Sequence, residues 1–284
     1  MEIEVYDKVY AVIRRIPLKE DREMYICFDR DGNRQYAIVR LKGKEIINHI
    51  LDFISTEKNN ESFTDLKDFF IYRGDLHIVF LHGRGTPIKK YFNRFLSLKK
   101  RITIGRNILE KIVVLKMSPY FTCQCLKPEN IMLTDSLNIS FEYKLEEIDS
   151  YEMFTWQNIS EAYCNILWFL FEDELKNDGE FPVNMLLEGI LREEIKGELN
   201  ILKEYENTCR RIDENAGENT EKQESRILRI WEKIFSFHKA AEKIIFIIIF
   251  LAVFTYMGYC IYSFFSPKEY NKNFETIGTL EIRD

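Results

Sequence analysis

Residues 123–133, CQCLKPENIML, bring together side chains that could perform chemistry: two thiols, a lysine and an amide. Cys123 and Cys125 could supply two soft ligands to a metal ion, but a structural zinc site needs four ligands. The histidines that could complete such a set are His49, His77, His82 and His238. We interpret the two cysteines as packed or half-exposed thiols and expect no metal ion and no cofactor.

The length and composition of the chain indicate a folded protein. Its 284 residues are enough for one large domain or two small ones, and 46% of them are hydrophobic, which excludes wholesale disorder. The net charge of -6 arises from many charges of both signs. Because the sequence has no basic stripe with interleaved aromatic residues, we expect no nucleic-acid partner.

The first part of the chain, residues 1–91, has the pattern of a β-rich lobe. VYAVIRRI and MYICFDRDGNRQYAIVRL favour strands, and Asp31-Gly32 interrupts the second run with a hairpin signal. KEIINHILDFI has apolar residues at helical spacing, and FFIYRGDLHIVFLHGRG predicts two strands around Arg73-Gly74. The predicted order is three strands, one helix and two strands.

The following residues, 92–212, predict a helical lobe. LSLKKRITIGRNILEKIVVLK repeats apolar residues on one face, and ISEAYCNILWFLFEDEL is apolar enough to be a central buried helix. A β-rich lobe followed by a helical lobe is a two-lobed α+β fold, in which a ligand cleft would lie between the lobes.

The order of elements over residues 5–175 resembles a protein kinase, with DLHIVFLHGRGTPIKKYF similar to the fifth strand, hinge and following helix, and CQCLKPENIML similar to the catalytic loop. Phosphoryl transfer needs a phosphate cradle, a lysine, a catalytic carboxylate and magnesium ligands. The turn RIPLKEDREM contains no glycine that would let the backbone approach a phosphate. Val39 stands at the position of the strand lysine, and strand alternation sends Arg40 to the opposite face. A one-residue shift of register would instead bring Arg40 to that site.

The catalytic loop is degenerate as well. Cys123, Gln124 and Cys125 match the kinase triplet His-Arg-Asp, and a thiol cannot replace the carboxylate, whose general-base help is worth about 10²- to 10⁴-fold in rate. Lys127 and Asn130 match the kinase lysine and asparagine. We interpret KPEN as a turn in which the proline fixes a dihedral angle and Asn130 bonds to the backbone.

The magnesium-binding Asp-Phe-Gly triplet does not occur in NISFEYKLEEID, which follows the loop. Glu142 or Asp149 could bind a metal in principle, but we expect both to be solvated. Because four parts are missing at once, the sequence predicts a pseudokinase domain without catalytic, cofactor-binding or metal-binding residues. Weak nucleotide binding without catalysis stays open.

A single transmembrane helix is predicted over residues 244–265, which include no charged side chain. As a helix this segment spans about 33 Å, against a hydrocarbon thickness of about 30 Å. Lysine and arginine are more frequent before the segment than after it, which predicts a cell-membrane protein with its N-terminal domain in the cytoplasm. In that compartment the cysteines before the span would be free thiols.

Two segments connect the folded domain to the predicted span. Residues 213–225, DENAGENTEKQES, have the composition of a polar linker. Residues 226–243 have apolar side chains at helical spacing with basic residues between them, which predicts an amphipathic juxtamembrane helix lying in the headgroup region or continuing as a coiled coil. A homodimer is therefore possible. Residues 266–284 would form an extracytoplasmic tail too short for a domain.

The second half of the chain also resembles a more specific family. SPYFTCQCLKPENIMLTDSLNISFEYKL, ISEAYCNILWFLF and FPVNMLLEGILREEIKGELNIL, followed by a basic amphipathic stretch and one span, are similar to the EssB/YukC family of membrane-anchored pseudokinases in the type VIIb secretion system of Firmicutes. The resemblance covers residues 95–265. It implies a non-catalytic docking domain whose partners are a small ubiquitin-like secretion component and the membrane ATPase of the same apparatus. Members of the family normally carry a larger helical extracytoplasmic region that helps them dimerise.

Three hypotheses from different classes follow. The first is a non-enzymatic scaffold that recruits cytoplasmic partners to a secretion machine. The second is a receptor-like membrane pseudokinase that regulates signalling by binding nucleotide or a kinase, which tight magnesium-dependent ATP binding would favour. The third is an active atypical kinase, which would have to replace all four missing parts elsewhere.

Overall fold

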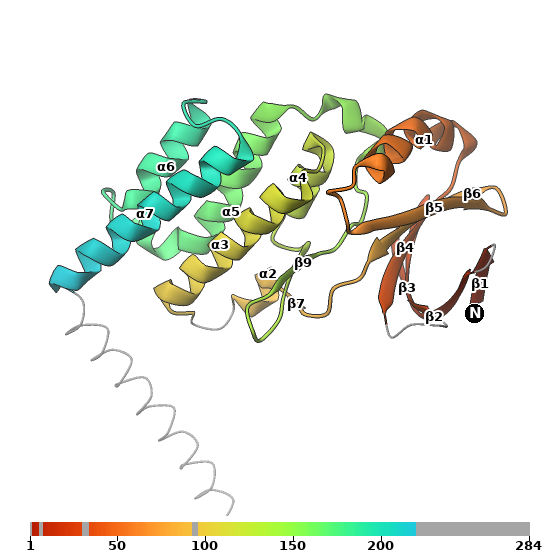
Figure 1. Ribbon diagram of the computed structural model, residues 1–284, viewed down its shortest axis with the longest axis horizontal. Helices are drawn as coiled ribbons and strands as arrows, with labels where there is room; N and C mark the ends of the chain where they lie inside the picture. The colour runs from red at the N-terminus through yellow and green to blue at the C-terminus, as the bar shows by residue number, and fades with distance from the viewer. Residues whose placement is uncertain (1, 6–7, 30–33, 93–95, 220–284) are drawn as a thin grey trace, which may run out of the picture. The chain divides into compact units, whose positions relative to one another are not determined.

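The described part of the chain combines β-strands and α-helices in a mixed α+β arrangement (Figure 1). This computed structural model describes residues 2–5, 8–29, 34–92 and 96–219. The chain divides into one compact unit, Met1–Asn215, and a second, Ala216–Asp284. Six positions match residues of the kinase site, and we call them the kinase-like positions: Val39, Cys123, Gln124, Cys125, Lys127 and Asn130. All of them belong to the first unit.

A six-stranded antiparallel sheet forms the N-terminal part of the first unit, with the strand order β1-β2-β3-β4-β6-β5. One helix, α1 (Lys44–Asn59), separates β4 from β5. The predicted order of three strands, a helix and two strands is confirmed, and the short strand β1 precedes it. The strands are β1 (Glu2–Val5), β2 (Lys8–Lys19), β3 (Arg22–Asp29), β4 (Gln35–Leu41), β5 (Leu66–Tyr72) and β6 (Asp75–Leu81).

The sheet curls until strands far apart in its order meet. Lys8 on β2 forms an ion pair of 2.8 Å with Asp68 on β5, and the ring of Tyr10 stacks on that of Phe70 with 6.4 Å between centroids. Both pairs join β2 to an edge strand with which it does not share a ladder. The inside of the curl is filled by one apolar cluster, made of Ile3, Tyr10, Tyr25, Cys27, Ile38, Phe70 and Val79.

Turn chemistry explains the β5–β6 hairpin. Arg73 and Gly74 have positive φ angles of 53° and 85°, as a two-residue turn between twisted strands requires. Gly74 accepts this conformation without steric cost. The second predicted hairpin turn, Asp31-Gly32, lies outside the described residues, although β3 and β4 pair with each other as an antiparallel hairpin would.

The helical part follows β6. Its central helix α5 (Trp156–Asn177) contacts α3, α4 and α6, and Tyr163, Leu167 and Phe171 on it are buried, which confirms the predicted central buried helix. A small sheet of order β7-β8-β9 lies beside these helices. The remaining elements are β7 (Thr86–Pro87), α2 (Ile88–Tyr91), α3 (Leu98–Leu115), α4 (Pro119–Cys125), β8 (Ile131–Leu133), β9 (Ile139–Phe141), a 3₁₀ helix η1 (Ile148–Met153), α6 (Pro182–Leu191) and α7 (Glu198–Asn219).

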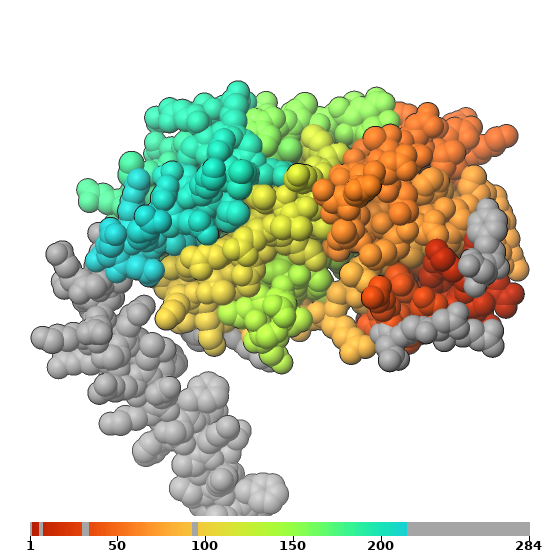
Figure 2. Space-filling model, in the orientation of Figure 1, coloured from red at the N-terminus to blue at the C-terminus, as the bar shows by residue number. Residues whose placement is uncertain are grey.

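Helices α3 and α7 lie side by side on the face seen in Figure 2. The hydroxyl group of Tyr205 on α7 donates a 2.9 Å hydrogen bond to the carbonyl oxygen of Ile102 on α3. This close approach depends on Gly105, because a Cβ atom at that position would lie 2.2 Å from the Tyr205 hydroxyl oxygen.

The first compact unit ends at Asn215, close to the domain end predicted near residue 212. Helix α7 continues to Asn219, so the first residues of the predicted linker 213–225 are helical. The polar composition that indicated a linker is also compatible with a helix. Residues 220–225 lie outside the described residues.

One apolar core connects the sheet with the helices. Met24 on β3 pairs with Val39 on β4, and both face the same cluster as Ile50 of α1, Leu109 of α3 and Leu167 of α5. The N-terminal sheet and the C-terminal helices are therefore packed against each other through continuous buried contacts.

Candidate functional site

Helix α4 contains the Cys-Gln-Cys triplet, where the resemblance to kinases predicted a loop. Ser118 precedes the helix and Pro119 is its first residue, a favourable start because the fixed φ of proline suits this position and its missing amide is not needed there. The loop predicted over residues 123–133 is thus wrong up to Cys125. The Ser-Pro pair was a sequence signal for this helix start.

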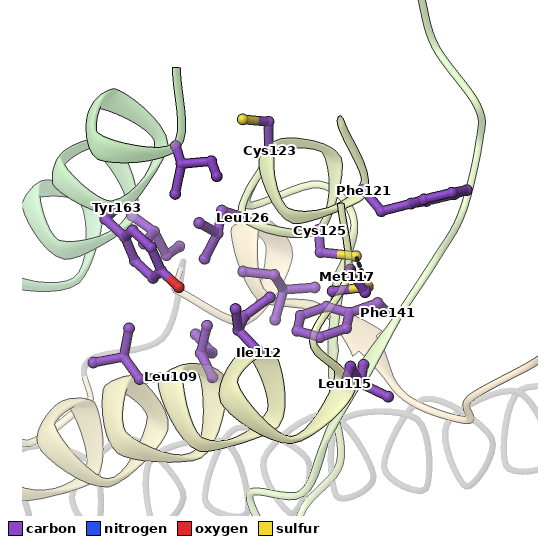
Figure 3. Packing of buried hydrophobic residues seen from close by; sticks show 14 of the residues in the cluster. Leu109, Ile112, Leu115, Met117, Phe121, Cys123, Cys125, Leu126, Phe141 and Tyr163 are labelled. Atoms are coloured by element: carbon purple, nitrogen blue, oxygen red, sulfur yellow. Dashed lines mark hydrogen bonds between the residues drawn. The ribbon is translucent and has the colours of Figure 1, made fainter. Parts of the chain in front are cut away.

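Both thiols are packed in the core, as predicted. Cys125 is 0% exposed, and its Sγ atom lies 3.9 Å from the Sδ atom of Met117, with Ile112 and Phe141 in the same cluster (Figure 3). Burial raises the pKa of the Cys125 thiol well above its usual range and that of Cys123 to about 12. At neutral pH neither thiol supplies the thiolate that nucleophilic or metal-binding chemistry needs.

The other described cysteines have the same character. Each is buried and carries a free thiol, as predicted; Cys260 lies outside the described residues. The free cysteines are Cys27, Cys123, Cys125, Cys164 and Cys209.

Gln124 and Asn130 hold the turn that joins α4 to β8. The side-chain amide of Asn130 donates a 2.8 Å hydrogen bond to the backbone carbonyl of Gln124, and the backbone amide of Glu142 donates to the Asn130 carbonyl at 2.8 Å. The interpretation of Asn130 as a turn residue bonded to the backbone is confirmed. The side-chain amide of Gln124 is buried, and neither of its polar atoms has a hydrogen-bond partner in the described parts of the chain.

Lys127 is engaged by a carboxylate. Its Nζ atom lies 2.9 Å from an oxygen of Glu146, and the Glu146 carbonyl accepts a hydrogen bond from the Tyr120 hydroxyl at 2.8 Å. The one lysine that matches the kinase loop thus forms an ion pair with the segment that follows β9.

Val39 and Arg40 lie on opposite faces of the sheet, as strand alternation predicted. Val39 is 0% exposed and belongs to the core that the sheet shares with the helices. The Arg40 guanidinium lies on the other face, where it contacts Asp75 through its Nε atom at 2.8 Å. The alternative register, which would have exchanged these faces, is excluded by the pairing of Val39 with Ile78.

The segment after β9 has its carboxylates paired with cations. Glu142 lies 3.1 Å from Lys144, and Asp149 accepts a hydrogen bond of 2.9 Å from Arg22 at the start of β3. Arg22 also donates to the carbonyl of Leu145. The expectation that both carboxylates are solvated holds in part for Asp149, whose side chain is 52% exposed although it is paired. It is wrong for Glu142, whose side chain is 14% exposed and paired with Lys144.

A buried polar pair that sequence reasoning missed joins the sheet to the helical part. The hydroxyl of Tyr143 donates a 2.9 Å hydrogen bond to Asp65, which follows α1, and the Nζ atom of Lys111 on α3 lies 3.3 Å from the same carboxylate oxygen. Asp65 and Tyr143 are separated by 78 residues. No local sequence pattern could have identified their contact.

A groove of about 530 Å³ lies at this junction. It is lined by Thr64 and Asp65 before β5, by residues of α3 that include Lys111, and by Asn138 and Ile139 at the start of β9. A cleft between the β-rich and helical parts was predicted from the order of elements. The six kinase-like positions do not line this groove.

Two predictions concern metals and membranes. Within residues 2–5, 8–29, 34–92 and 96–219, histidine, cysteine and carboxylate side chains form no group of three or more that could hold a metal ion. Over the same ranges, no helix combines the length and apolar character needed to cross a bilayer. The predicted span 244–265, the juxtamembrane segment 226–243 and the tail 266–284 lie outside the described residues.

Comparisons with known proteins add no assignment. The chain matches no protein-family model, and its sequence matches no curated protein.

Proposed function

We propose that this protein is a non-catalytic pseudokinase with a two-lobed, protein-kinase-like fold, which is anchored in the membrane and serves as a docking scaffold. The observation that carries the proposal is the burial of the degenerate positions. Val39 and Cys125, which stand where a kinase places its strand lysine and catalytic aspartate, are both 0% exposed in an apolar core. A nucleotide phosphate needs charged and polar partners at these positions.

The order and pairing of the elements support the kinase-like fold. Strands β2, β3 and β4, helix α1 and strands β5 and β6 follow in the order of a kinase N-terminal lobe. Helix α3, the KPEN turn and the paired strands β8 and β9 follow in the order of a kinase C-terminal lobe. The helical conformation of residues 123–125 is the local departure from that plan.

Aromatic rings fill the junction of the two lobes. Phe63 and Phe80 come from the N-terminal lobe and Phe121 and Tyr143 from the helical lobe. The rings of Phe63 and Phe121 lie 4.9 Å apart and those of Phe80 and Tyr143 4.5 Å apart. Kinases open and close their lobes during turnover, and a junction of interlocked aromatic rings opposes that motion.

Charged contacts oppose the same motion. Arg22 of β3 binds the segment after β9 through Asp149 and Leu145, and Asp65 is tied to Tyr143 and Lys111. A rigid body suits a protein that other proteins bind, because little conformational entropy is lost when the complex forms.

The secretion role rests on the resemblance to the EssB/YukC family. We propose a component of a type VIIb secretion machine whose cytoplasmic domain docks the ubiquitin-like secretion component and the membrane ATPase of the apparatus. The predicted span at 244–265 would hold that domain at the membrane as a single-pass protein, either alone or as a homodimer.

The decisive experiment measures phosphate transfer and nucleotide binding by the detergent-solubilised full chain. We expect no incorporation of labelled phosphate from MgATP, and no rise of the unfolding temperature in MgATP over magnesium alone. Transfer that is abolished by Lys127→Ala and retained by Lys89→Ala, a substitution on the surface of α2, would show that the chain is a kinase. Tight MgATP binding without transfer would favour the receptor-like pseudokinase.

Co-purification tests the secretion role separately. Tagged full-length chain, solubilised from its native membrane, should retain a ubiquitin-like protein and a large membrane ATPase. A sample that retains neither protein, while the chain itself is folded and monodisperse, would contradict the proposed partners. It would not be evidence that the chain is a kinase.

A further inference from the structure

A small cavity opens where the curled sheet ends, away from the kinase-like positions. It has a volume of about 80 Å³ and is lined by Ile3 of β1, Tyr25 of β3, Arg40 of β4 and His77 of β6, together with the hairpin between β5 and β6. This volume exceeds the need of one water molecule and is far below the roughly 300–1,000 Å³ of pockets for drug-sized ligands. The cavity therefore has room for one small group.

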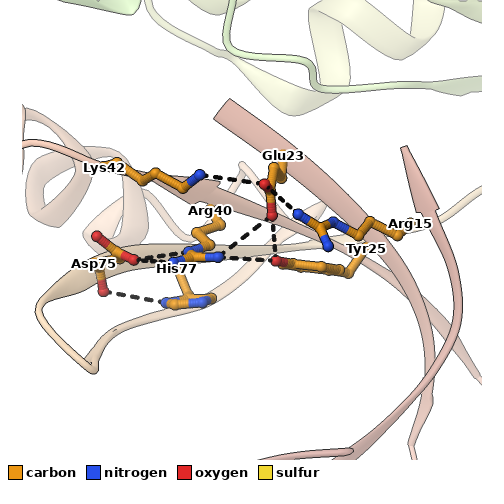
Figure 4. Close-up of polar contacts among 7 residues, drawn as sticks. All are labelled: Arg15, Glu23, Tyr25, Arg40, Lys42, Asp75 and His77. Atoms are coloured by element: carbon orange, nitrogen blue, oxygen red, sulfur yellow. Dashed lines mark hydrogen bonds and ion pairs between the residues drawn. The ribbon is translucent and has the colours of Figure 1, made fainter. Parts of the chain in front are cut away.

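Two positively charged side chains, Arg40 and Arg73, line the cavity. Arg40 is held by Asp75, which contacts its Nε atom at 2.8 Å and its Nη2 atom at 2.5 Å (Figure 4). On the other side of the guanidinium, Nη1 lies 3.4 Å from Glu23 and 3.3 Å from the Tyr25 hydroxyl. The guanidinium of Arg73 lies 5.1 Å from the ring centroid of Tyr72, which also lines the cavity. No carboxylate of the described residues forms an ion pair with Arg73.

A second carboxylate near the cavity, that of Glu23, accepts hydrogen bonds from several neighbouring side chains. Glu23 accepts hydrogen bonds from the Tyr25 hydroxyl at 2.6 Å, from Arg15 at 2.5 Å, from Lys42 at 3.2 Å and, more weakly, from Arg40 at 3.4 Å. The Tyr25 hydrogen bond, together with the hydrogen bonds from Arg15 and Lys42, lowers the pKa of Glu23 to about 2. Four cationic side chains therefore lie around two carboxylates in this region, although the chain as a whole is acidic. The cations are Arg15, Arg40, Lys42 and Arg73, and the carboxylates are Glu23 and Asp75.

Buried polar groups complete the lining. Tyr25 and His77 are almost fully buried, and the Nδ1 atom of His77 lies 3.1 Å from the carbonyl oxygen of Asp75. Because a carbonyl oxygen only accepts, Nδ1 carries the proton and Nε2 carries the lone pair of the neutral ring. Burial lowers the pKa of His77, which favours this neutral form. A protonated phosphate oxygen could donate to such a nitrogen.

We propose that this cavity binds a single phosphate group, held by Arg73 and Arg40 at the mouth of the curled sheet. A phosphate group offers several acceptor oxygens, which match the forked donors of arginine better than a point charge does. Mouths of closed or nearly closed sheets are preferred ligand positions. The proposal does not depend on the scaffold function, because the cavity lies on the face of the sheet opposite Val39.

The test measures binding of inorganic phosphate to the detergent-solubilised full chain by titration calorimetry and by the unfolding temperature, against sodium chloride of equal ionic strength. Arg73→Gln removes the arginine that lacks an ion pair, and its side chain is exposed, so the fold should be retained. Arg14→Gln is the matched control. Arg14 is also exposed, but its partner on β3 is Ile26, whose side chain lies on the opposite face of the sheet from Tyr25 and therefore from the cavity.

We expect saturable phosphate binding that Arg73→Gln weakens about tenfold or more, because a hydrogen bond between charged partners is lost. Arg14→Gln should leave the affinity unchanged within about twofold. The proposal is overturned if phosphate acts no differently from chloride, or if both variants weaken binding equally, since the effect would then be general surface charge.

A second arm identifies the source of the phosphate group. Vesicles of phosphatidylcholine with and without phosphatidic acid are mixed with the same protein, with inorganic phosphate as competitor. Binding that requires phosphatidic acid and is displaced by phosphate assigns the group to a lipid headgroup. Binding of inorganic phosphate without vesicle binding assigns it to a soluble phosphate ester.

Discussion

The side-chain amide of Asn130 is hydrogen-bonded at 2.8 Å to the backbone carbonyl of Gln124, so the turn after α4 is tied to the helix that precedes it. Asn130 is 0% exposed, and its Oδ1 atom has no hydrogen-bond partner in the described segments. The residue that matches a magnesium ligand in kinases thus has a purely architectural contact here.

Replacing Asn130 by aspartate should be strongly destabilising. Asn130→Asp removes the donor to Gln124 and buries a carboxylate that has no donor of its own, which costs about 3 kcal/mol. The unfolding temperature of the full chain should fall by about 6–12 °C. Asn138→Asp makes the same change at an exposed asparagine and should shift the unfolding temperature by less than about 2 °C. Equal shifts for the two variants would contradict the buried turn contact.

The hydrogen bond between Tyr143 and Asp65 should contribute measurably to stability. Tyr143→Phe keeps the ring in the aromatic cluster but leaves Asp65 with Lys111 as its remaining partner. We expect a loss of about 1–2 kcal/mol in the free energy of unfolding, measured in denaturant. Tyr151→Phe removes a hydroxyl that bonds to exposed Glu152 and should be almost neutral. A neutral Tyr143→Phe would mean that water replaces the contact.

Glu198 should make stability depend on pH. Burial raises the pKa of this carboxyl to about 7, with the Thr122 hydroxyl as its hydrogen-bond partner. The folded state therefore binds the proton more tightly than the unfolded state, so the stability that Glu198 gives is present below about pH 4.5 and is lost as the pH rises towards 7.

Glu198→Gln, which stays neutral, should consequently raise the unfolding temperature at pH 8 by about 2–4 °C and leave it unchanged at pH 4.5. Glu194→Gln replaces an exposed carboxylate nearby and should show no such difference between the two pH values. A stabilisation by Glu198→Gln that is equal at both pH values would show that the gain does not come from the proton.

Gly105 should not tolerate a side chain. A Cβ atom there would lie 2.2 Å from the hydroxyl oxygen of Tyr205, so Gly105→Ala must push α7 away from α3 or break the hydrogen bond to Ile102. We expect a loss of about 2–3 kcal/mol, as for other overpacked core positions. Gly179→Ala meets no atom within 4 Å and should change stability by less than about 1 kcal/mol. Thermal unfolding of both variants gives the comparison.

Local rules predicted the parts of the fold that depend on neighbouring residues. The turn at Arg73-Gly74 follows from backbone conformations that few residues adopt, and the opposite directions of Val39 and Arg40 follow from strand alternation. The contact of Asn130 with the backbone was predictable because asparagine side chains in turns commonly bond to nearby backbone groups. Each of these involves residues close in sequence.

Contacts between distant residues could not be derived in this way. The ion pair of Lys8 with Asp68 closes the curl of the sheet, and the bond of Tyr143 to Asp65 joins two halves of the molecule. Polar residues on strands and turns are ordinarily solvated, so composition gave no reason to pair them. The helix that contains Cys123 is a different case, because the resemblance to kinases predicts a loop there while the Ser-Pro pair indicates a helix start.

The shared core has a consequence for any attempt to engineer charged side chains into this chain. Val39, Cys123 and Cys125 are interior residues, so the space and the polarity around them limit which side chains can take their places. A lysine or aspartate at one of these positions would be a buried, unpaired charge and would cost several kcal/mol. A variant designed to carry both charged groups would therefore have to be repacked around them before it could fold stably.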